Sequence, residues 1–435
     1  MKLLHINFSD NGGGAANAAY RLHRGLCDLP AESSMMVALK RTSDPTVHEF
    51  SPSRKPTRRF YRYIRRKMIA QSLNKDIRSR LSGYEAFSDC RTSFGTELLG
   101  QINKPDIINL HWVANFLDYS SFFTSVALTT IPVVWTLHDM NPFTGGCHYD
   151  IGCGKYEENC GACPQLGSND PNDISYKIWR RKHTLFEKIC PELFTIVTPS
   201  QWLAEKSRAS SLLQKFPVKV IPNGLDIKEF APRDKKISRK TLGLPPDAKV
   251  ILFISDVVGN KRKGFIYLNK ALTEMQHLEN LFLMISGREG ETINTTIPYR
   301  YLGRIADSRM LSMVYSAADV FVVPSLQDNL PNTVLESMAC GTPVVGFKVG
   351  GLPDMVRYGE TGVLAEPENV DSLRNAIVHL ITCPDILAVM SVNCRKVVVE
   401  EYSQSVQALK YMALYRHLID LKQSQRDKNA FSFNG

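Results

Sequence analysis

The feature that most constrains this chain is a repeated alternation of short apolar runs with longer stretches of helix-like spacing. Continuous Val/Ile/Leu/Phe runs without polar alternation are typical of parallel strands that are covered by helices on both faces. We expect strands in two series: 2–8, 34–40, 106–112, 133–139 and 194–200, then 249–255, 281–287, 299–304, 319–325, 343–347 and 362–367. The alternation therefore predicts an α/β protein with parallel sheets.

Two series of strands in 435 residues indicate two domains, because one compact domain of this length is unusual. A Pro-Asn-Gly turn at 222–224 separates the series. We expect domains at 1–222 and 223–402, and a C-terminal helix within 403–435 that packs back on the first domain. Open parallel sheets bind ligands beyond the carboxyl ends of their strands. The fold class we expect is two doubly wound, Rossmann-like domains that face each other across a cleft.

Composition excludes some classes of protein. The chain is 43% hydrophobic and 22% charged, as in ordinary globular proteins, and no run approaches the ~20 apolar residues of a membrane span. The apolar run at the N-terminus is too short for a signal peptide, so we expect a cytoplasmic protein. The net charge of +10 is local, since residues 54–80 hold eleven bases and one acid. One basic segment without a recognised binding module does not indicate a nucleic-acid partner.

The basic segment 54–80 has an amphipathic pattern. On a helical projection one face carries Phe60, Tyr61, Ile64 and Met68, and around it stand Arg58, Arg62, Arg65 and Arg66. A basic amphipathic helix of this kind lies on anionic lipid. We therefore expect contact with an anionic membrane surface; a solvated basic helix or a loop that faces a substrate is the alternative.

The strongest candidate for a ligand site is the segment 324–346. A strand ends there, a polar turn follows, and a helix begins near Asn332. The first amides of such a helix, those of Asn332 and Thr333, are a natural seat for a diphosphate. Asp328 and Glu336 flank the turn and can hold sugar and ribose hydroxyls. A capped helix with two solvated acids is the alternative interpretation.

This segment resembles the donor site of family-4-type retaining glycosyltransferases of GT-B fold. Their signature is two acids separated by seven residues before a Cys-Gly-x-Pro-Val-Val run, which stands here as Asp328, Glu336 and 340–345. The resemblance implies that the first acid contacts the donor hexose and the second the ribose. Asp328 is one carbon shorter than the usual Glu. Pro331 stands where Gly is usual and offers no N–H.

Two further segments fit the resemblance. In 253–268, Lys263 and Gly264 match a Lys-Gly element whose cations neutralise the leaving diphosphate. Asp256 stands at the usual Arg position, and we expect Arg262 to replace that charge; a solvated KRK loop is the alternative. In 9–22, Gly13 and Gly14 follow the first strand, and the resemblance implies that this turn approaches the donor phosphates.

Two of the predicted strands have histidines near their carboxyl ends. His138 and Asp139 end the predicted strand 133–139, and the resemblance implies that a histidine at this position lies beside the donor sugar. His111 is a weaker candidate of the same kind. A structural role for either residue is the alternative.

Four cysteines lie close together in 147–163. Cys147, Cys153, Cys160 and Cys163 are separated by five, six and two residues in a loop rich in polar residues and glycine. Four thiolates that end in a Cys-x2-Cys pair suit a closed zinc site, which we expect to be structural. Unligated thiols or a redox pair are the alternative. A similar loop occurs in a subgroup of these transferases that resembles enzymes of colanic acid and exopolysaccharide synthesis.

The resemblance implies a hexosyltransferase that moves a hexose from a nucleotide-diphosphate sugar to a saccharide acceptor, which can be lipid-linked, in bacterial surface polysaccharide synthesis. It implies His138, Arg262, Lys263 and Asp328 as catalytic residues and no cofactor for the chemistry. The second domain would bind the donor and the first the acceptor, at the cytoplasmic face of the membrane. The alternatives are a sugar-nucleotide epimerase of the same fold and an inactive nucleotide-sugar-binding protein.

Overall fold

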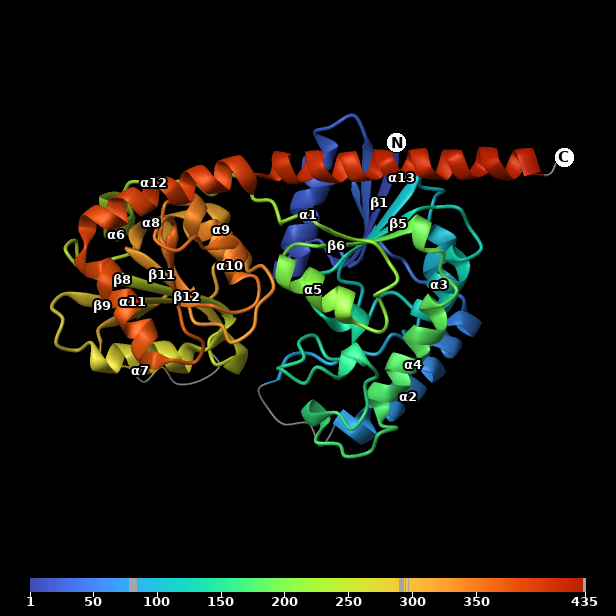
Figure 1. The fold of residues 1–435 in the computed structure, drawn as a ribbon, viewed down its shortest axis with the longest axis horizontal. Coiled ribbons are helices and arrows are strands. Elements are labelled where there is room, and N and C mark those ends of the chain that lie inside the picture. The colour runs from blue at the N-terminus through green and yellow to red at the C-terminus, as the bar shows by residue number, and fades with distance from the viewer. Residues whose placement is uncertain (78–83, 289–292, 294, 296, 433–435) are drawn as a thin grey trace. The chain divides into compact units, whose positions relative to one another are not determined.

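The computed structural model describes residues 1–77, 84–288, 293, 295 and 297–432 (Figure 1). The chain forms two compact units, residues 1–222 with 407–435 and residues 223–406. Each unit has its own sheet and its own core.

Unit 1 is built on a seven-stranded parallel sheet with the order β3-β2-β1-β4-β5-β6-β7. Its strands are β1 (Lys2–Ser9), β2 (Glu32–Leu39), β3 (Val47–Glu49), β4 (Ile107–Leu110), β5 (Val133–Thr136), β6 (Phe194–Thr198) and β7 (Val218–Val220). Its helices are α1 (Gly14–Cys27), α2 (Pro56–Ile77), α3 (Tyr119–Val126), α4 (Ile174–Phe186), α5 (Gln201–Ala209) and α13 (Gln404–Ser432). The five strands predicted in this half are confirmed, and the three-residue strands β3 and β7 are additional.

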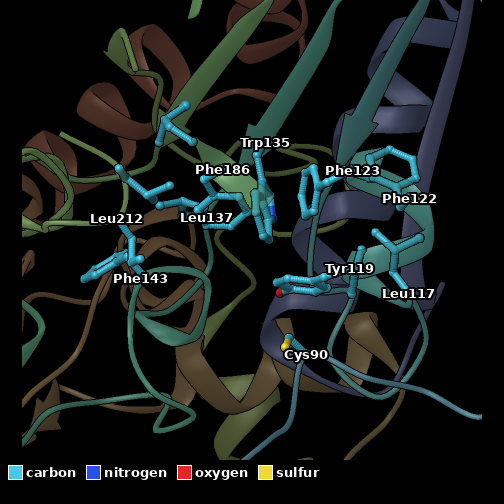
Figure 2. Packing of buried hydrophobic residues seen from close by; sticks show 14 of the residues in the cluster. Cys90, Leu117, Tyr119, Phe122, Phe123, Trp135, Leu137, Phe143, Phe186 and Leu212 are labelled. Carbon is cyan, nitrogen blue, oxygen red and sulfur yellow. The ribbon is translucent and has the colours of Figure 1, made fainter. Parts of the chain in front are cut away.

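Both faces of the unit 1 sheet are buried. Successive residues of β1 point to opposite faces, so Leu4 packs in one cluster and Leu3 in another. The first cluster is rich in aromatic side chains, which meet around Trp135 (Figure 2). The second cluster contains the apolar side of α13, whose Tyr411 and Tyr415 are fully buried. Two buried hydrogen bonds join α13 to the sheet, from Asn109 Nδ2 to Tyr415 Oη at 2.7 Å and between Thr136 Oγ1 and Tyr411 Oη at 2.9 Å.

Unit 2 is built on a six-stranded parallel sheet with the order β10-β9-β8-β11-β12-β13. Its strands are β8 (Lys249–Val257), β9 (Leu281–Arg288), β10 (Tyr299–Tyr301), β11 (Val320–Val323), β12 (Val344–Phe347) and β13 (Gly362–Ala365). Its helices are α6 (Lys235–Thr241), α7 (Phe265–Glu274), α8 (Ser308–Ala317), α9 (Asn332–Ala339), α10 (Leu352–Met355), α11 (Val370–Thr382) and α12 (Pro384–Glu401). All six predicted strands are present. Alternate residues of β8 pack into two clusters on opposite faces of the sheet, so the predicted fold class of two doubly wound, Rossmann-like units is confirmed.

The topology of each sheet marks one place for a ligand. Strand order reverses between β1 and β4 in unit 1, and between β8 and β11 in unit 2. At such a point the connections leave the sheet on opposite faces, which opens a crevice at the carboxyl ends of the two strands. The segments after β8 and β11 are those that the sequence singled out.

Helix α2 carries the basic segment, and two of its arginines differ from the predicted arrangement. Arg62 pairs with Glu97 at 2.8 Å and Arg65 pairs with Asp118 at 2.6 Å, so both point toward the body of unit 1. A helical projection gives the angles between side chains but not their partners. The prediction that both surround an apolar outer face is therefore wrong, while Arg58 and Arg66 are exposed. Residues 78–80 of this segment lie outside the described residues.

No single described helix is long and apolar enough to cross a membrane. Helices α11 and α12, which form a bent pair, together have the length and composition of a membrane-spanning segment. Leu373, Ile377, Leu380 and Met390 of this pair are buried in the core of unit 2.

Candidate functional site

Two loops that are far apart in the sequence meet at the strand-order reversal of unit 2. Lys263 lies in a short 3-10 turn (Lys261–Lys263) that follows β8, and Asp328 follows β11. Lys263 Nζ donates a hydrogen bond of 2.6 Å to Asp328 Oδ2, and Arg262 Nη1 lies 3.3 Å from Asp328 Oδ1. The structure thus brings three predicted catalytic residues of unit 2 into one cluster.

The backbone holds this cluster in place. Leu326 N–H donates to Arg262 O at 2.8 Å, and Arg262 Nη1 donates to Gln327 O at 2.7 Å. Gly264 has a φ of +70°, and a Cβ added there would stand 1.8 Å from Pro324 O. Since no side chain fits that space, glycine after Lys263 is required for the two loops to approach each other.

Asp328 is an ionised acid in a buried position, with 6% of its surface exposed. Burial raises its pKa, but the charges of Lys263 and Arg262 and hydrogen bonds from Lys263 and Ser325 lower it to about 2. A carboxylate with this pKa accepts hydrogen bonds throughout the physiological range. Asp328 is thus suited to accept hydrogen bonds from hydroxyl groups and to keep Lys263 charged and oriented.

The two cations differ in how far they reach into solvent. The side chain of Lys263 is 22% exposed, whereas that of Arg262 is 9% exposed and also bonds to a backbone carbonyl. Lys263 is therefore the better placed of the two to meet an anionic ligand. Arg262 acts mainly as the clamp between the loops.

Helix α9 carries the second acid. Glu336 is 6% exposed and accepts a hydrogen bond of 3.1 Å from Tyr315 Oη of α8. The helix begins at Asn332, directly after the N-cap residue Pro331, whose side chain makes no capping hydrogen bond. Asn332 Oδ1 accepts a hydrogen bond of 3.3 Å from Asn223 Nδ2. The first amides of a helix, here those of Asn332 and Thr333, suit an anion.

Sequence reasoning missed two polar residues near these loops. Tyr315 gave no signal because it lies within helix α8 and belongs to no motif. Arg288 ends β9, and its guanidinium pairs with Asp256 at the end of β8. A basic residue at the end of the predicted strand could have indicated Arg288 from the sequence. The pair of Arg288 and Asp256 places a cation at the carboxyl edge of the sheet.

The candidate residues of unit 1 also lie at the carboxyl edge of its sheet. Gly13 and Gly14 open helix α1 directly after β1, and both are exposed. His138 follows β5 and is half-buried. Burial lowers the pKa of His138 to about 4 against the opposing charge of Asp139, so the ring is neutral at physiological pH.

Asp139 serves the local structure. Its carboxylate is bonded to His148 Nδ1 at 2.6 Å and accepts hydrogen bonds from Trp112 Nε1 at 2.8 Å and Asn141 N–H at 2.9 Å. These contacts tie the chain after β5 to the start of the cysteine loop.

The four cysteines of the predicted zinc site lie around one pocket. Cys147, Cys153, Cys160 and Cys163 all line it and are free thiols. Among the described residues no group of three or more His, Cys, Asp or Glu side chains is placed to hold a metal ion, and the structural zinc site stays a prediction. Cys160 Sγ accepts a hydrogen bond of 3.1 Å from Gly145 N–H.

The buried cysteines should react slowly with thiol reagents. Burial raises the pKa of Cys160 to about 12, against 9 for an ordinary thiol. A shift of this size lowers the thiolate fraction at pH 8 by roughly 10³. Iodoacetamide labelling followed by peptide mapping should modify the exposed Cys190 first and Cys160 only on unfolding. Equal labelling rates at the two sites in folded protein would contradict this arrangement.

Parts of this chain are similar to known proteins. Residues 248–383 match the family model described as "Glycosyl transferases group 1". A D-inositol 3-phosphate glycosyltransferase of Actinosynnema mirum is 31% identical over 43% of this chain and 50% of its own length. The UDP-Gal:alpha-D-GlcNAc-diphosphoundecaprenol alpha-1,3-galactosyltransferase of Escherichia coli is 28% identical over 46% of this chain and 54% of its own length. The chain thus spans about half the length of these curated relatives.

The fold has solved counterparts along the whole chain. Anabaena Alr3699/HepE, solved in complex with UDP-glucose, superposes with a TM-score of 0.66 over 96% of this chain and 100% of that protein, at 16% identity. An identity this low supports the fold alone. Residues 248–383 are thus similar to the glycosyl transferases group 1 family, and the chain as a whole has the GT-B fold of these solved structures.

Proposed function

We propose that this chain is a glycosyltransferase that moves a hexose from a nucleotide-diphosphate sugar to a saccharide acceptor. The observation that carries the proposal is the Lys263–Asp328 pair, which joins a cation and an ionised acid at the strand-order reversal of unit 2. The group 1 match covers both residues. The sequence relatives are also named as glycosyltransferases.

In this proposal each group of unit 2 has its own task. Lys263 neutralises the leaving nucleotide diphosphate, with the amides of Asn332 and Thr333 as further donors. Asp328 accepts hydrogen bonds from hexose hydroxyls, and Glu336 does so from the ribose. The bond from hexose C1 to the diphosphate oxygen breaks, and its electron pair stays with the phosphate. The acceptor hydroxyl then attacks the oxocarbenium-like centre and passes its proton to an oxygen of the leaving phosphate.

Unit 1 supplies the acceptor side in this proposal. Gly13, Gly14 and His138, at the carboxyl edge of its sheet, are by the resemblance the residues of this unit that approach the donor. The resemblance to family-4-type enzymes supports retention of the anomeric configuration, by attack on the face that the diphosphate leaves. It also supports a role in bacterial exopolysaccharide synthesis of the colanic acid kind. The E. coli relative is named for a diphosphoundecaprenol substrate, which supports a lipid-linked acceptor.

Thermal stabilisation by a panel of nucleotide sugars tests the proposal. A ligand at 100 times its dissociation constant adds roughly 2.7 kcal/mol to the stability of the folded state. Stabilisation by at least one nucleotide sugar is the expected result, and the Lys263→Ala variant should lose it. Product formation only in the presence of an acceptor separates a transferase from an epimerase, which converts the donor alone, and from an inactive binding protein.

The outer face of α2 supports a membrane-surface location on the cytoplasmic side. Arg62 and Arg65 form ion pairs with acids in the body of unit 1, so the opposite face of α2 points outward. That face exposes Phe60, Tyr63, Ile64 and Met68, and basic side chains flank it. Apolar side chains among exposed bases match the chemistry of an anionic lipid surface.

Flotation with anionic vesicles tests this location. Full-length protein should float with phosphatidylglycerol vesicles at low salt, and more of it should stay soluble at 0.5 M salt. The double substitution Phe60→Ser and Met68→Ser should abolish flotation. Leu128→Ser, which changes another exposed apolar residue of unit 1, is the matched control and should float. Soluble wild-type protein at low salt would rule out the surface.

A further inference from the structure

Three histidines form a continuous hydrogen-bonded chain in unit 1. His138 Nε2 lies 3.2 Å from His111 Nδ1, and His111 Nε2 lies 2.9 Å from His5 Nδ1. The rings are stacked, with centroids 5.4 Å and 5.2 Å apart. They follow or lie on three adjacent strands, β5, β4 and β1, so the sheet itself sets their spacing. The chain runs from half-buried His138 to fully buried His5.

The three histidine rings stay neutral at physiological pH. Burial lowers the pKa of His5 and of His111 well below the ordinary value, and neighbouring histidines lower each further. Burial also lowers the pKa of His138 to about 4. Each ring therefore carries one N–H, on either Nδ1 or Nε2.

Neutral rings linked in this way have only two shared states. Each hydrogen bond needs one proton between its two nitrogens, so the tautomer of His5 determines that of His111, which determines that of His138. Either all three carry the proton on Nδ1, or all three carry it on Nε2. In the first state His138 Nδ1 is a donor, and in the second it is an acceptor.

The environment of His5, the buried end of the row of histidines, selects between these two tautomeric states. His5 Nε2 is buried and has no hydrogen-bond partner among the described residues. The neighbouring ring of His23 does not offer one, because its nitrogens lie 2.8 Å from Ser33 Oγ and 2.8 Å from Thr46 Oγ1. A buried N–H without a partner is rarer than an unpaired acceptor. The state with a bare His5 Nε2, in which all three rings carry Nδ1–H, is therefore favoured.

We propose that His5 and His111 are positioning residues that hold His138 in its Nδ1–H tautomer, so that His138 donates a hydrogen bond to a ligand oxygen. The ligand class rests on the proposed function, in which sugar hydroxyl and phosphate oxygens are the acceptors available. A histidine fixed as a donor orients such an oxygen without adding charge to the site. Neither His5 nor His111 needs to touch the ligand for this role.

The test is the ¹⁵N spectrum of full-length protein labelled at its histidine ring nitrogens, with His138 assigned from the His138→Gln variant. His5, His111 and His138 should all show a protonated Nδ1 and a bare Nε2, the reverse of the form that histidine prefers in water. The His111→Phe variant should return His138 to the Nε2–H form. His23→Gln, which changes a ring that contacts His5 without a hydrogen bond, is the matched control and should leave His138 unchanged.

Different tautomers among the three rings, or a folded His111→Phe protein that keeps His138 as Nδ1–H, would overturn the proposal. If the Phe variant does not fold, His111→Ala removes the same two hydrogen bonds and admits water to His138 Nε2. His138 should again return to the Nε2–H form. The spectra need no nucleotide sugar. A negative result therefore leaves the proposed transferase intact, and failure of every nucleotide sugar to bind leaves the tautomer assignment intact.

Discussion

Lys263→Ala should lower turnover by ~10²–10³ while leaving a folded protein, because it removes a charge aimed at the group that leaves. Lys263 is the more exposed of the two cations beside Asp328. Arg262 stays within 3.3 Å of Asp328 in the variant, so the buried carboxylate keeps one cationic partner. Steady-state rates with the nucleotide sugar found by thermal stabilisation, measured at saturating donor, give the effect on kcat.

Lys261→Ala is the matched control for that substitution. Lys261 lies two residues away in the same turn and is exposed, so it should keep at least half of the wild-type rate. Circular dichroism of both variants checks that unit 2 remains folded. Equal rates in the two variants would show that Lys263 does not act on the donor, and the site would then need another cation, such as Arg288.

The fold class could be predicted from the sequence because most strands are marked by a short run of apolar residues. Five of the six strands of unit 2, all except β10 (Tyr299–Tyr301), are mainly apolar runs, and each of the six was found. β3 (Val47–Glu49) and β7 (Val218–Val220) were missed because three residues, Val-His-Glu and Val-Lys-Val, carry no periodic pattern. Their strand conformation comes from pairing with β2 and β6, which is a tertiary effect.

The candidate site was only partly accessible from the sequence. Lys263 and Asp328 were named separately from their motifs, but their 2.6 Å contact joins positions 65 residues apart and depends on how two loops pack. The division of labour between Lys263 and Arg262 depends on exposure, which no motif encodes. The spacing of the four cysteines did indicate a common site, since all four line one pocket.

The buried histidines of unit 1 should make this unit sensitive to acid. Burial lowers the pKa of His23 to about 4, from 6.5 for an ordinary histidine, against the opposing charge of nearby Asp44. The folded pKa lies below the unfolded one, so the unfolded chain takes up a proton first as the pH falls. The stability that this residue contributes is full above about pH 6.5 and is lost progressively down to about pH 4.

The expected loss is large. A shift from 6.5 to about 4 corresponds to ~3 kcal/mol at pH 4 for His23 alone, at about 1.4 kcal/mol per pKa unit. His5, His111 and His138 shift in the same direction, so the total loss exceeds that of one group. A loss of this size is a substantial part of the 5–15 kcal/mol that is typical of a folded domain.

Tryptophan fluorescence measures this effect in unit 1 alone, because all four tryptophans, Trp112, Trp135, Trp179 and Trp202, belong to it. Urea unfolding followed by this signal should give a free energy that falls steeply between pH 6.5 and 4.5. His23→Gln should flatten the slope, since Gln can keep a hydrogen bond to Thr46 but binds no proton. His48→Gln changes an exposed histidine of the same unit and is the control that should leave the slope as in the wild type. A free energy that does not change over this pH range would mean that the histidines are charged or solvated in the folded state.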